Sequence, residues 1–445
     1  MSVRAASLMV LVGAVLLGIP WQAGAAGVPV TGTPVSAVTG TPATSVPVTG
    51  TPATSAPPTG VPADAFKDFP VASEVRLGGD ETQTRMVVDF SQKIELRAFT
   101  LANPYRVIID LPQVVFRLPP QTGESGRGLV KAFRYGLMMT GGSRIVLDLT
   151  RPARVDKSFV LDATPDQPAR LVLDLSAVDR DAFMRTIALE NKPREPTVAI
   201  KPQPKTDARP VIVLDPGHGG IDNGTKAASG EMEKSIVLEF ALLLRDKIEK
   251  AGKYHVVMTR SDDTFVPLAD RVALARAQQA ALFISIHADA LPRGEGDAQG
   301  ASVYTLSETA SDSEAARLAE TENRADVIAG VDLTYEPNDV ADILIDLAQR
   351  ETKTFSVQFA RGLIESMRTA TRMHKNTLKS AGFRVLKAPD IPSVLIELGY
   401  VSNRADLKSL TSAEWREHTA DSIAQAIDRF FVTRLAGSSR ANGQN

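Results

Sequence analysis

Two histidines and a glutamate stand where predicted strands or helices begin or end. His218 lies in a glycine-rich turn after the apolar strand 211–214, and His287 ends the apolar run 282–287. Glu233 begins a predicted helix. Two imidazoles and one carboxylate are the usual protein ligands of a catalytic zinc ion, which leaves the fourth position to water. Because bound zinc lowers the pKa of that water and polarises a carbonyl group, these residues predict metal-assisted hydrolysis.

A fourth residue, Glu397, is the candidate general base. It ends the apolar strand 393–397, so its side chain should emerge at the same edge of the sheet as the two histidines. Taken singly, these residues also have structural explanations. His218 could merely form a hydrogen bond within its turn, and Glu397 could be a carboxylate whose charge is satisfied in the core.

The segment 209–433 must position these residues, and it alternates strands with helices. This alternation predicts an α/β fold with a mainly parallel sheet covered by helices. Strands are expected at 211–214, 255–259, 281–287, 301–305 and 393–397. Helices are expected at 233–251, 268–280, 354–367 and around 423–431. Ligands of open α/β sheets bind beyond the carboxyl ends of the strands, where His218, His287 and Glu397 are expected.

Residues 66–180 contain short strands separated by turns, and they predict an N-terminal β-sandwich. Residues 84–91 resemble residues 143–150, and residues 105–111 resemble residues 169–175. Two copies of a strand pair indicate a small pseudo-symmetric sandwich. We find no clustered histidines or paired acids in it, so a binding or targeting module is favoured over a second enzyme, with a structural spacer as the alternative. A Pro-rich linker is expected at 181–208.

The two ends of the chain are predicted to lie outside the folded domains. Residues 1–26 combine a charged start, a short apolar run and a small-residue cleavage site, which is typical of a signal peptide. We therefore expect an exported, periplasmic protein without a permanent membrane span, with an uncleaved anchor as the alternative. Residues 27–65 are rich in Thr, Pro and Gly and predict a disordered tether, and residues 434–445 predict a disordered tail.

The composition narrows the chemistry further. The chain of 445 residues contains no cysteine, which excludes disulfides, thiolate zinc sites and cysteine nucleophiles. A net charge of −2 gives no indication of nucleic-acid binding.

Of the five histidines, His255 and His418 are expected to be surface or packing residues. His374 is expected on the solvated surface, with a position in a substrate groove as the alternative.

With these residues assembled, residues 209–432 resemble the zinc-dependent N-acetylmuramoyl-L-alanine amidases of the amidase_3 family. The motifs that carry the resemblance are Asp215–Gly220, Glu233-Lys234, Ser285–Ala288 and Pro392–Asn403. The resemblance implies that His218, Glu233 and His287 bind zinc and that Glu397 is the catalytic acid/base. Asn223 and Asp289 depart from the family pattern, in which proline and asparagine are usual. Neither residue is an expected zinc ligand, so these departures put the details of substrate recognition in doubt and not the hydrolytic reaction.

The resemblance also implies a substrate and partners. The reaction would be hydrolysis of the amide between N-acetylmuramic acid and L-alanine in peptidoglycan. Residues 69–178 are similar to the AMIN module, which implies peptidoglycan binding and placement of the enzyme at the division site. Daughter-cell separation would then be its role. A non-catalytic peptidoglycan-binding protein and a zinc peptidase that cuts within the stem peptide are the competing interpretations.

An insert at 306–352 predicts regulation, because compact domains rarely carry so long a connection. One helical face carries Ala315, Leu318, Ala319 and Glu322, so Glu322 is a carboxylate on an otherwise apolar stripe. Because an unpaired buried carboxylate is unfavourable, Glu322 requires a cation beside it. In family members with such an insert, a helix is thought to cover the zinc site until a LytM-type activator displaces it. The resemblance implies the same arrangement here. We expect Glu322, with Glu320 as the alternative, to reach the zinc; a solvated helix edge is the competing interpretation. A second amphipathic helix at 340–347 could dock a partner or simply pack.

Overall fold

The computed structural model describes residues 69–138, 142–190, 207, 209–289, 298–331 and 343–441. The signal peptide expected at 1–26, the tether expected at 27–65 and most of the linker lie outside the described residues. Among the helices of the described ranges, none has the length and apolar character needed to cross a membrane.

The N-terminal region is built from two mainly antiparallel sheets, as the sequence predicted. Their strand orders are β5-β1-β2-β9-β8 and β3-β4-β7-β6. The strands are β1 (Val71–Gly79), β2 (Gln83–Phe90), β3 (Arg97–Leu101), β4 (Arg106–Pro112), β5 (Val115–Phe116), β6 (Val130–Met138), β7 (Gly142–Leu149), β8 (Ala153–Leu161) and β9 (Ala169–Ala177). Apolar side chains from both sheets, among them Met86, Val107, Leu147 and Leu171, form one core.

The internal repeat appears in the way these strands pair. The first copy supplies β2 and β4, the second supplies β7 and β9, and β2 pairs with β9 while β4 pairs with β7. Equivalent residues form equivalent ion pairs: Arg85 lies 2.6 Å from Asp174, and Arg144 lies 2.6 Å from Asp110. The predicted pseudo-symmetry is therefore present, and each sheet combines one strand from each copy.

A helix occupies the start of the expected linker. This helix, α1 (Arg180–Glu190), buries Phe183 and Ile187 four residues apart, on one helical face. The ring of Phe183 meets that of Tyr105 edge to face at 5.1 Å. The linker thus begins later than the expected residue 181, because this apolar pair binds the helix to the sandwich.

The C-terminal domain contains the predicted mainly parallel sheet, with strand order β11-β10-β12-β15-β13-β14. Its strands are β10 (Val211–Pro216), β11 (His255–Met258), β12 (Leu282–His287), β13 (Ala301–Leu306), β14 (Met373–Ala381) and β15 (Ser393–Glu397). Strands β11, β10, β12 and β15 are parallel, whereas β13 runs antiparallel to β15. The sequence analysis missed β14, whose alternation of polar and apolar residues is interrupted by a register shift.

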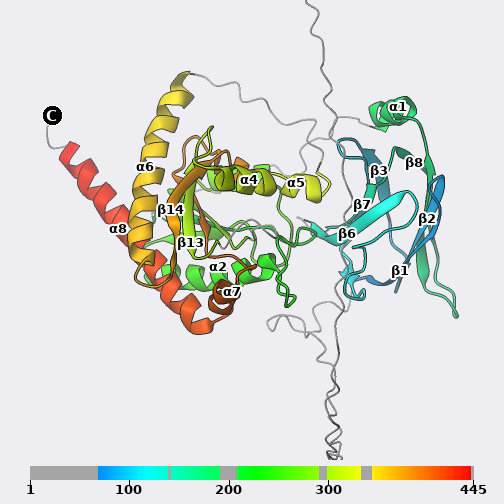
Figure 1. Cartoon of the computed structure of the whole chain (residues 1–445), viewed down its shortest axis with the longest axis horizontal. Coiled ribbons are helices and arrows are strands. Elements are labelled where there is room, and N and C mark those ends of the chain that lie inside the picture. Colours follow the sequence, from blue (N-terminus) through cyan, green and yellow to red (C-terminus); the bar gives the residue numbers. More distant parts are fainter. Residues whose placement is uncertain are drawn as a thin grey trace, which may run out of the picture. The chain divides into compact units, whose positions relative to one another are not determined.

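Helices cover both faces of this sheet. Helices α2 (Glu233–Lys250), α6 (Ile343–Met367) and α8 (Ala413–Ala441) share one hydrophobic core with the strands. Figure 1 shows α6 and α8 beside each other, with β13 and β14 next to α6. The opposite face packs against α3 (Leu268–Ala277), α4 (Ser313–Glu322) and α5 (Ala325–Ile328). A short helix, α7 (Arg404–Leu410), precedes α8.

The insert contains the predicted helix with the predicted buried face. Its buried residues in α4 are Ala315, Leu318, Ala319 and Glu322, and the N-cap Asp312 accepts a hydrogen bond from the Ala315 amide. The two helices expected at 340–347 and 354–367 form the single helix α6, which begins at Ile343. At the other end of the domain, α8 continues to Ala441, into the segment that was expected to be a disordered tail.

Candidate metal centre and active site

The carboxyl ends of three neighbouring strands bring the candidate residues together. Strand β12 ends at His287 and β15 ends at Glu397, and these two residues are register partners. His218 follows the end of β10 and adopts a left-handed backbone with φ of 59°. A Cβ atom at Gly217 would lie 2.3 Å from Cε1 of His287, so only glycine allows the turn to approach this ring so closely.

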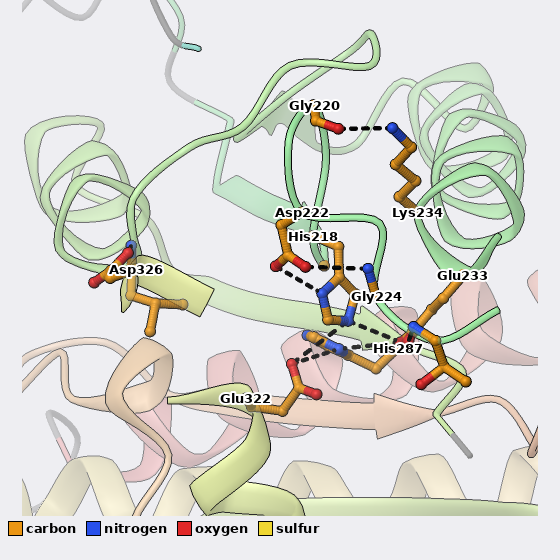
Figure 2. Close-up of polar contacts among 12 residues, drawn as sticks. His218, Gly220, Asp222, Gly224, Glu233, Lys234, His287, Glu322 and Asp326 are labelled. Atoms are coloured by element: carbon orange, nitrogen blue, oxygen red, sulfur yellow. Dashed lines mark hydrogen bonds and ion pairs between the residues drawn. The ribbon is translucent and has the colours of Figure 1, made fainter. Parts of the chain in front are cut away.

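Four polar atoms converge at this edge of the sheet, three of them from the predicted metal ligands. Nε2 of His218 lies 3.1 Å from Oε1 of Glu233, and Nδ1 of His287 lies 3.4 Å from the same oxygen. The fourth atom, Oε2 of Glu322, lies 3.1 Å from Nδ1 of His287 and 3.6 Å from Nε2 of His218. Figure 2 shows Glu322 reaching towards the two imidazoles from α4. The side chain of Glu322 is buried.

Hydrogen bonds fix the direction of each predicted ligand. Oδ2 of Asp222 lies 2.9 Å from Nδ1 of His218, which places the proton there and leaves Nε2 free to face the cluster (Figure 2). The Glu233 carboxylate accepts hydrogen bonds from the backbone amides of Thr225 at 3.0 Å and Ala288 at 2.9 Å. Although burial opposes it, the charges of His218 and His287 hold the pKa of Glu233 well below its usual range.

The donor set of the cluster fits a metal ion. His218, Glu233 and His287 form a buried group whose ligand atoms all lie within 4.8 Å of one another. Nε2 of His218 and Nδ1 of His287 are buried and make no hydrogen bond to any described residue. Tetrahedral zinc with bonds of about 2.0–2.1 Å separates neighbouring ligand atoms by about 3.4 Å. The distances from Oε1 of Glu233 to the two imidazole nitrogens, 3.1 Å and 3.4 Å, are close to this value.

Glu397 lies beside this cluster with one oxygen free. Its Oε2 accepts a hydrogen bond from the Asp289 amide at 3.0 Å. Its Oε1 is buried without a hydrogen-bond partner among the described residues. Burial and the neighbouring carboxylates of Asp289 and Glu233 raise the pKa of Glu397 well above its usual range. A carboxyl group of this kind can hold and release a proton, as a general acid–base residue requires.

Comparisons with known proteins show the family to which the chain is similar. Residues 212–429 match the family described as N-acetylmuramoyl-L-alanine amidase, and residues 74–175 match the AMIN domain. The chain is 35% identical over 374 residues to the N-acetylmuramoyl-L-alanine amidase AmiC of Escherichia coli O6:H1, an alignment that covers 80% of this chain and 89% of the relative. It is 34% identical over 384 residues to AmiC of Neisseria meningitidis serogroup B, covering 82% and 91%.

The chain belongs to the N-acetylmuramoyl-L-alanine amidase family. Members of this family are hydrolases. Among solved structures, the amidase AmiC2 of Nostoc punctiforme matches with 25% identity and a TM-score of 0.36, covering 50% of this chain and 97% of that one.

Buried arginines hold the first turn of the amidase domain, and the sequence analysis did not identify them. Arg271 donates to Asp215, Pro216 and His218, with distances of 2.8–2.9 Å. Arg260 donates to the carbonyls of Pro216 at 3.0 Å and Gly217 at 2.8 Å. Burial lowers the pKa of Arg260 to about 10. No local pattern marks either arginine, because their partners in this turn lie 43 to 56 residues away. The sequence analysis also missed Asp222, although its position only four residues after His218 could have suggested a contact between the two side chains.

The remaining candidates are placed apart from the metal cluster. The Glu320 side chain is 64% exposed and pairs with Arg324 at 2.5 Å, so it points away from the two imidazoles. His418 is exposed and His255 is half-buried, as expected. The prediction that His374 is solvated is wrong: its ring is 3% exposed, and its Nδ1 accepts a hydrogen bond from the Asn376 amide at 3.1 Å. It lies on β14, the strand that the sequence analysis missed.

Proposed function

We propose that this protein is a zinc-dependent enzyme that hydrolyses the amide between N-acetylmuramic acid and L-alanine in peptidoglycan. The single observation that carries the proposal is the convergence of His218, Glu233 and His287 beside Glu397, in a chain of the amidase family. The two relatives named above carry the same activity in their names.

In this proposal His218, Glu233 and His287 hold the zinc ion. When bound, zinc supplies polarisation of the amide carbonyl and a more acidic water. Asp222 keeps the His218 ring oriented, and the amides of Thr225 and Ala288 keep the Glu233 carboxylate oriented. Because these supports are buried, the protein can hold the ligands in place before the substrate binds.

Glu397 moves the proton in the proposed reaction. Its free Oε1 accepts a proton from the attacking water and then donates it to the nitrogen of the leaving amine. The hydrogen bond from the Asp289 amide to Oε2 keeps the carboxylate in place during both transfers.

We further propose that the enzyme is autoinhibited by α4, the inhibitory helix. Oε2 of Glu322 lies within 3.6 Å of a nitrogen of each imidazole, so with zinc bound it would be a further ligand and would exclude the reacting water. The cavity that remains beside His218, His287 and Glu322 has a volume of about 10 Å³, room for about one water molecule and not for a peptide. Burial raises the pKa of Glu322 against the attraction of the imidazoles, so a cation would stabilise its charged form.

Activation then requires that another molecule displaces the inhibitory helix. The helix is fastened at its end, where Asn323 donates to Gly382 at 2.9 Å and accepts from the Arg384 amide at 2.8 Å. A LytM-type activator is the proposed partner.

Export to the periplasm, a role of the AMIN sandwich in peptidoglycan binding and a role of the enzyme in cell separation complete the proposal. The match of residues 74–175 to the AMIN domain supports the second of these.

Purified protein loaded with zinc and added to isolated peptidoglycan sacculi tests this proposal. Glu322→Ala should release free stem peptides about tenfold faster than wild type without an activator, in the usual range of an allosteric coupling. Glu397→Ala should release none. Glu320→Ala is the matched control, because it removes an exposed carboxylate from the same helix, and it should behave as wild type.

The products separate the competing interpretations. Release of intact stem peptides that begin with L-alanine supports the amidase. Fragments that arise from cleavage within the stem would indicate a zinc peptidase. If no variant releases peptides and all bind sacculi, the protein is a peptidoglycan-binding protein.

A further inference from the structure

A second carboxylate of the inhibitory helix, that of the half-buried Glu314, lies eight residues before Glu322. Oε1 of Glu314 lies 2.8 Å from Nζ of Lys379 and accepts a hydrogen bond from the Tyr400 hydroxyl at 2.6 Å. Oε2 of Glu314 lies 4.0 Å from Nε2 of His374. Lys379 and His374 come from β14, and Tyr400 follows β15. A cation and two polar groups thus surround one carboxylate.

Lys379 is an unusual residue for the interior of a protein. Its side chain is 0% exposed, whereas lysines are almost never fully buried unless they are paired. Within the described residues Nζ has no well-directed hydrogen bond, and Glu314 is the carboxylate within ion-pair distance. Against the effect of burial, Lys379 and Tyr400 lower the pKa of Glu314, which favours its charged carboxylate form. Removing Glu314 would leave a buried, unpaired cation, which is strongly unfavourable.

The Lys379 cluster lies on the same face of the sheet as the catalytic centre. Lys379 is the register partner of Tyr304, which in turn faces Leu395 across the next strand. Leu395 and Glu397 are two residues apart on β15 and therefore point to the same face. The Tyr304 hydroxyl is buried there without a hydrogen-bond partner among the described residues. The inhibitory helix packs on this face through Ala315 and Leu318.

Glu314 and Glu322 of the inhibitory helix would therefore leave their sites together. When α4 is displaced, the metal centre loses Glu322 and Lys379 loses Glu314. Eight residues of an α-helix span about 12 Å, and extended chain covers about 3.3–3.6 Å per residue. A peptide whose scissile amide lies at the metal centre would reach Lys379 about three residues further along.

We propose that Lys379, Tyr400 and His374 form a binding subsite for a carboxylate of the stem peptide, which Glu314 occupies in the inhibited state. The inhibitory helix then imitates the substrate at two points, the reacting centre and the acidic peptide. This inference rests on the proposed function, because it takes the stem peptide as the substrate. The subsite makes the enzyme select peptides with a free carboxylate about three residues from the scissile amide.

Steady-state kinetics with matched substrates test the subsite. The parent protein is the double variant Glu314→Gln, Glu322→Ala, which lacks both carboxylates that hold the inhibitory helix over the metal centre and Lys379. The substrates are a muramyl tripeptide with diaminopimelate as its third residue, and the same compound with the carboxyl groups of that residue amidated. Adding Lys379→Met to the parent should raise KM for the acidic substrate about tenfold, as expected for a lost hydrogen bond to a charged group. It should leave kcat and the KM for the amidated substrate unchanged.

A control and a milder variant guard against effects on folding. Lys375→Met removes an exposed lysine from the same strand and should change neither KM. If Lys379→Met does not fold by circular dichroism, Tyr400→Phe in the parent removes only the hydroxyl and should raise KM for the acidic substrate about threefold. An equal rise for both substrates, or no preference of the parent for the acidic one, would overturn the subsite.

A binding measurement separates this inference from the proposed function. Calorimetry with the free tripeptide, which carries no scissile amide, should show about tenfold weaker binding to the Lys379→Met variant than to the parent. If this difference appears although no variant hydrolyses any substrate, the subsite holds and the proposed function fails. If the parent cleaves the amide and Lys379→Met changes neither Kd nor KM, the function holds and the subsite is refuted.

Discussion

The β-sandwich and the amidase domain use charged side chains in opposite ways. In the sandwich, Arg85 and Asp174 pair across neighbouring strands where the arginine is 59% exposed, and Arg144 and Asp110 repeat this pair in the other sheet. At the carboxyl edge of the amidase sheet, buried atoms of His218 and His287 have no hydrogen-bond partner among the described residues. Charges that are paired across strands support a fold, whereas buried imidazole nitrogens without a hydrogen-bond partner are available to bind a metal ion.

The largest effect should follow from removing the carboxylate of Glu397, the proposed general acid–base residue. Glu397→Gln, in a Glu322→Ala background, should lower amide hydrolysis by about 10³-fold, because general acid–base catalysis contributes about 10²–10⁴-fold. Bound zinc should stay the same, as measured by atomic absorption. Hydrolysis by Glu397→Gln within a factor of three of the background would refute the role of Glu397 and weaken the contrast with the sandwich.

Metal content tests the unpartnered imidazoles directly. His218→Ala should lose its zinc and no longer gain thermal stability from added zinc, because three protein ligands are needed to hold the ion firmly. The matched control is His418→Ala, which removes an exposed histidine of the same domain and should bind zinc as wild type does. Equal zinc content in both variants would mean that the ion binds elsewhere.

Chemical denaturation compares a buried ion pair with an exposed one. Arg271→Met breaks the pair with Asp215, whose atoms lie 2.8 Å apart with both side chains almost fully buried. It should lower the free energy of unfolding by about 3–5 kcal/mol, because an uncompensated buried carboxylate remains. Arg85→Met in the sandwich should hardly move the unfolding midpoint, since water solvates the remaining aspartate. A similar loss in both variants would remove the distinction between the two regions.

The smallest effect should come from the end of the inhibitory helix. Asn323→Ala removes the two hydrogen bonds to Gly382 and Arg384, each worth about 0.5 kcal/mol at this partly exposed helix end. Release of stem peptides without activator should therefore rise by about tenfold at most, and by less than in Glu322→Ala. Asn376→Ala, at an exposed position of β14, is the control. Unchanged release by Asn323→Ala would mean that other contacts hold the helix.

Local patterns in the sequence were enough to predict much of this arrangement. Apolar runs that end in His287 and Glu397 predicted strands that the structure contains with the same final residues. Parallel strands bring their carboxyl ends to one edge, so convergence followed from topology alone. The periodicity of residues 315–322 predicted the buried face of α4, including Glu322, because helical spacing is a local property. The metal-binding, catalytic and inhibitory roles of these residues stay predictions.

Contacts between segments far apart in the chain could not be predicted from local sequence patterns. The burial of His374 depends on β14, which the interrupted alternation of that strand concealed. The pair of Glu314 and Lys379 joins residues 65 positions apart, and neither has a neighbour in sequence that indicates the other. The pairing of strands between the two copies of the repeat in the sandwich was likewise not predictable. Both copies have the same sequence pattern, so the pattern does not show which strand pairs with which.

The sequence by itself determined which residues face inward and which elements carry the chemistry, because hydrophobic periodicity and turn chemistry act over a few residues. Tertiary structure alone decided which buried charges are matched. Arg271 meets Asp215 and Lys379 meets Glu314, while the nitrogens of His218 and His287 face each other across an oxygen of Glu233. Such pairings depend on distances of a few ångströms between segments far apart in the chain. The energy of a buried charge therefore follows from the fold and not from the residue type.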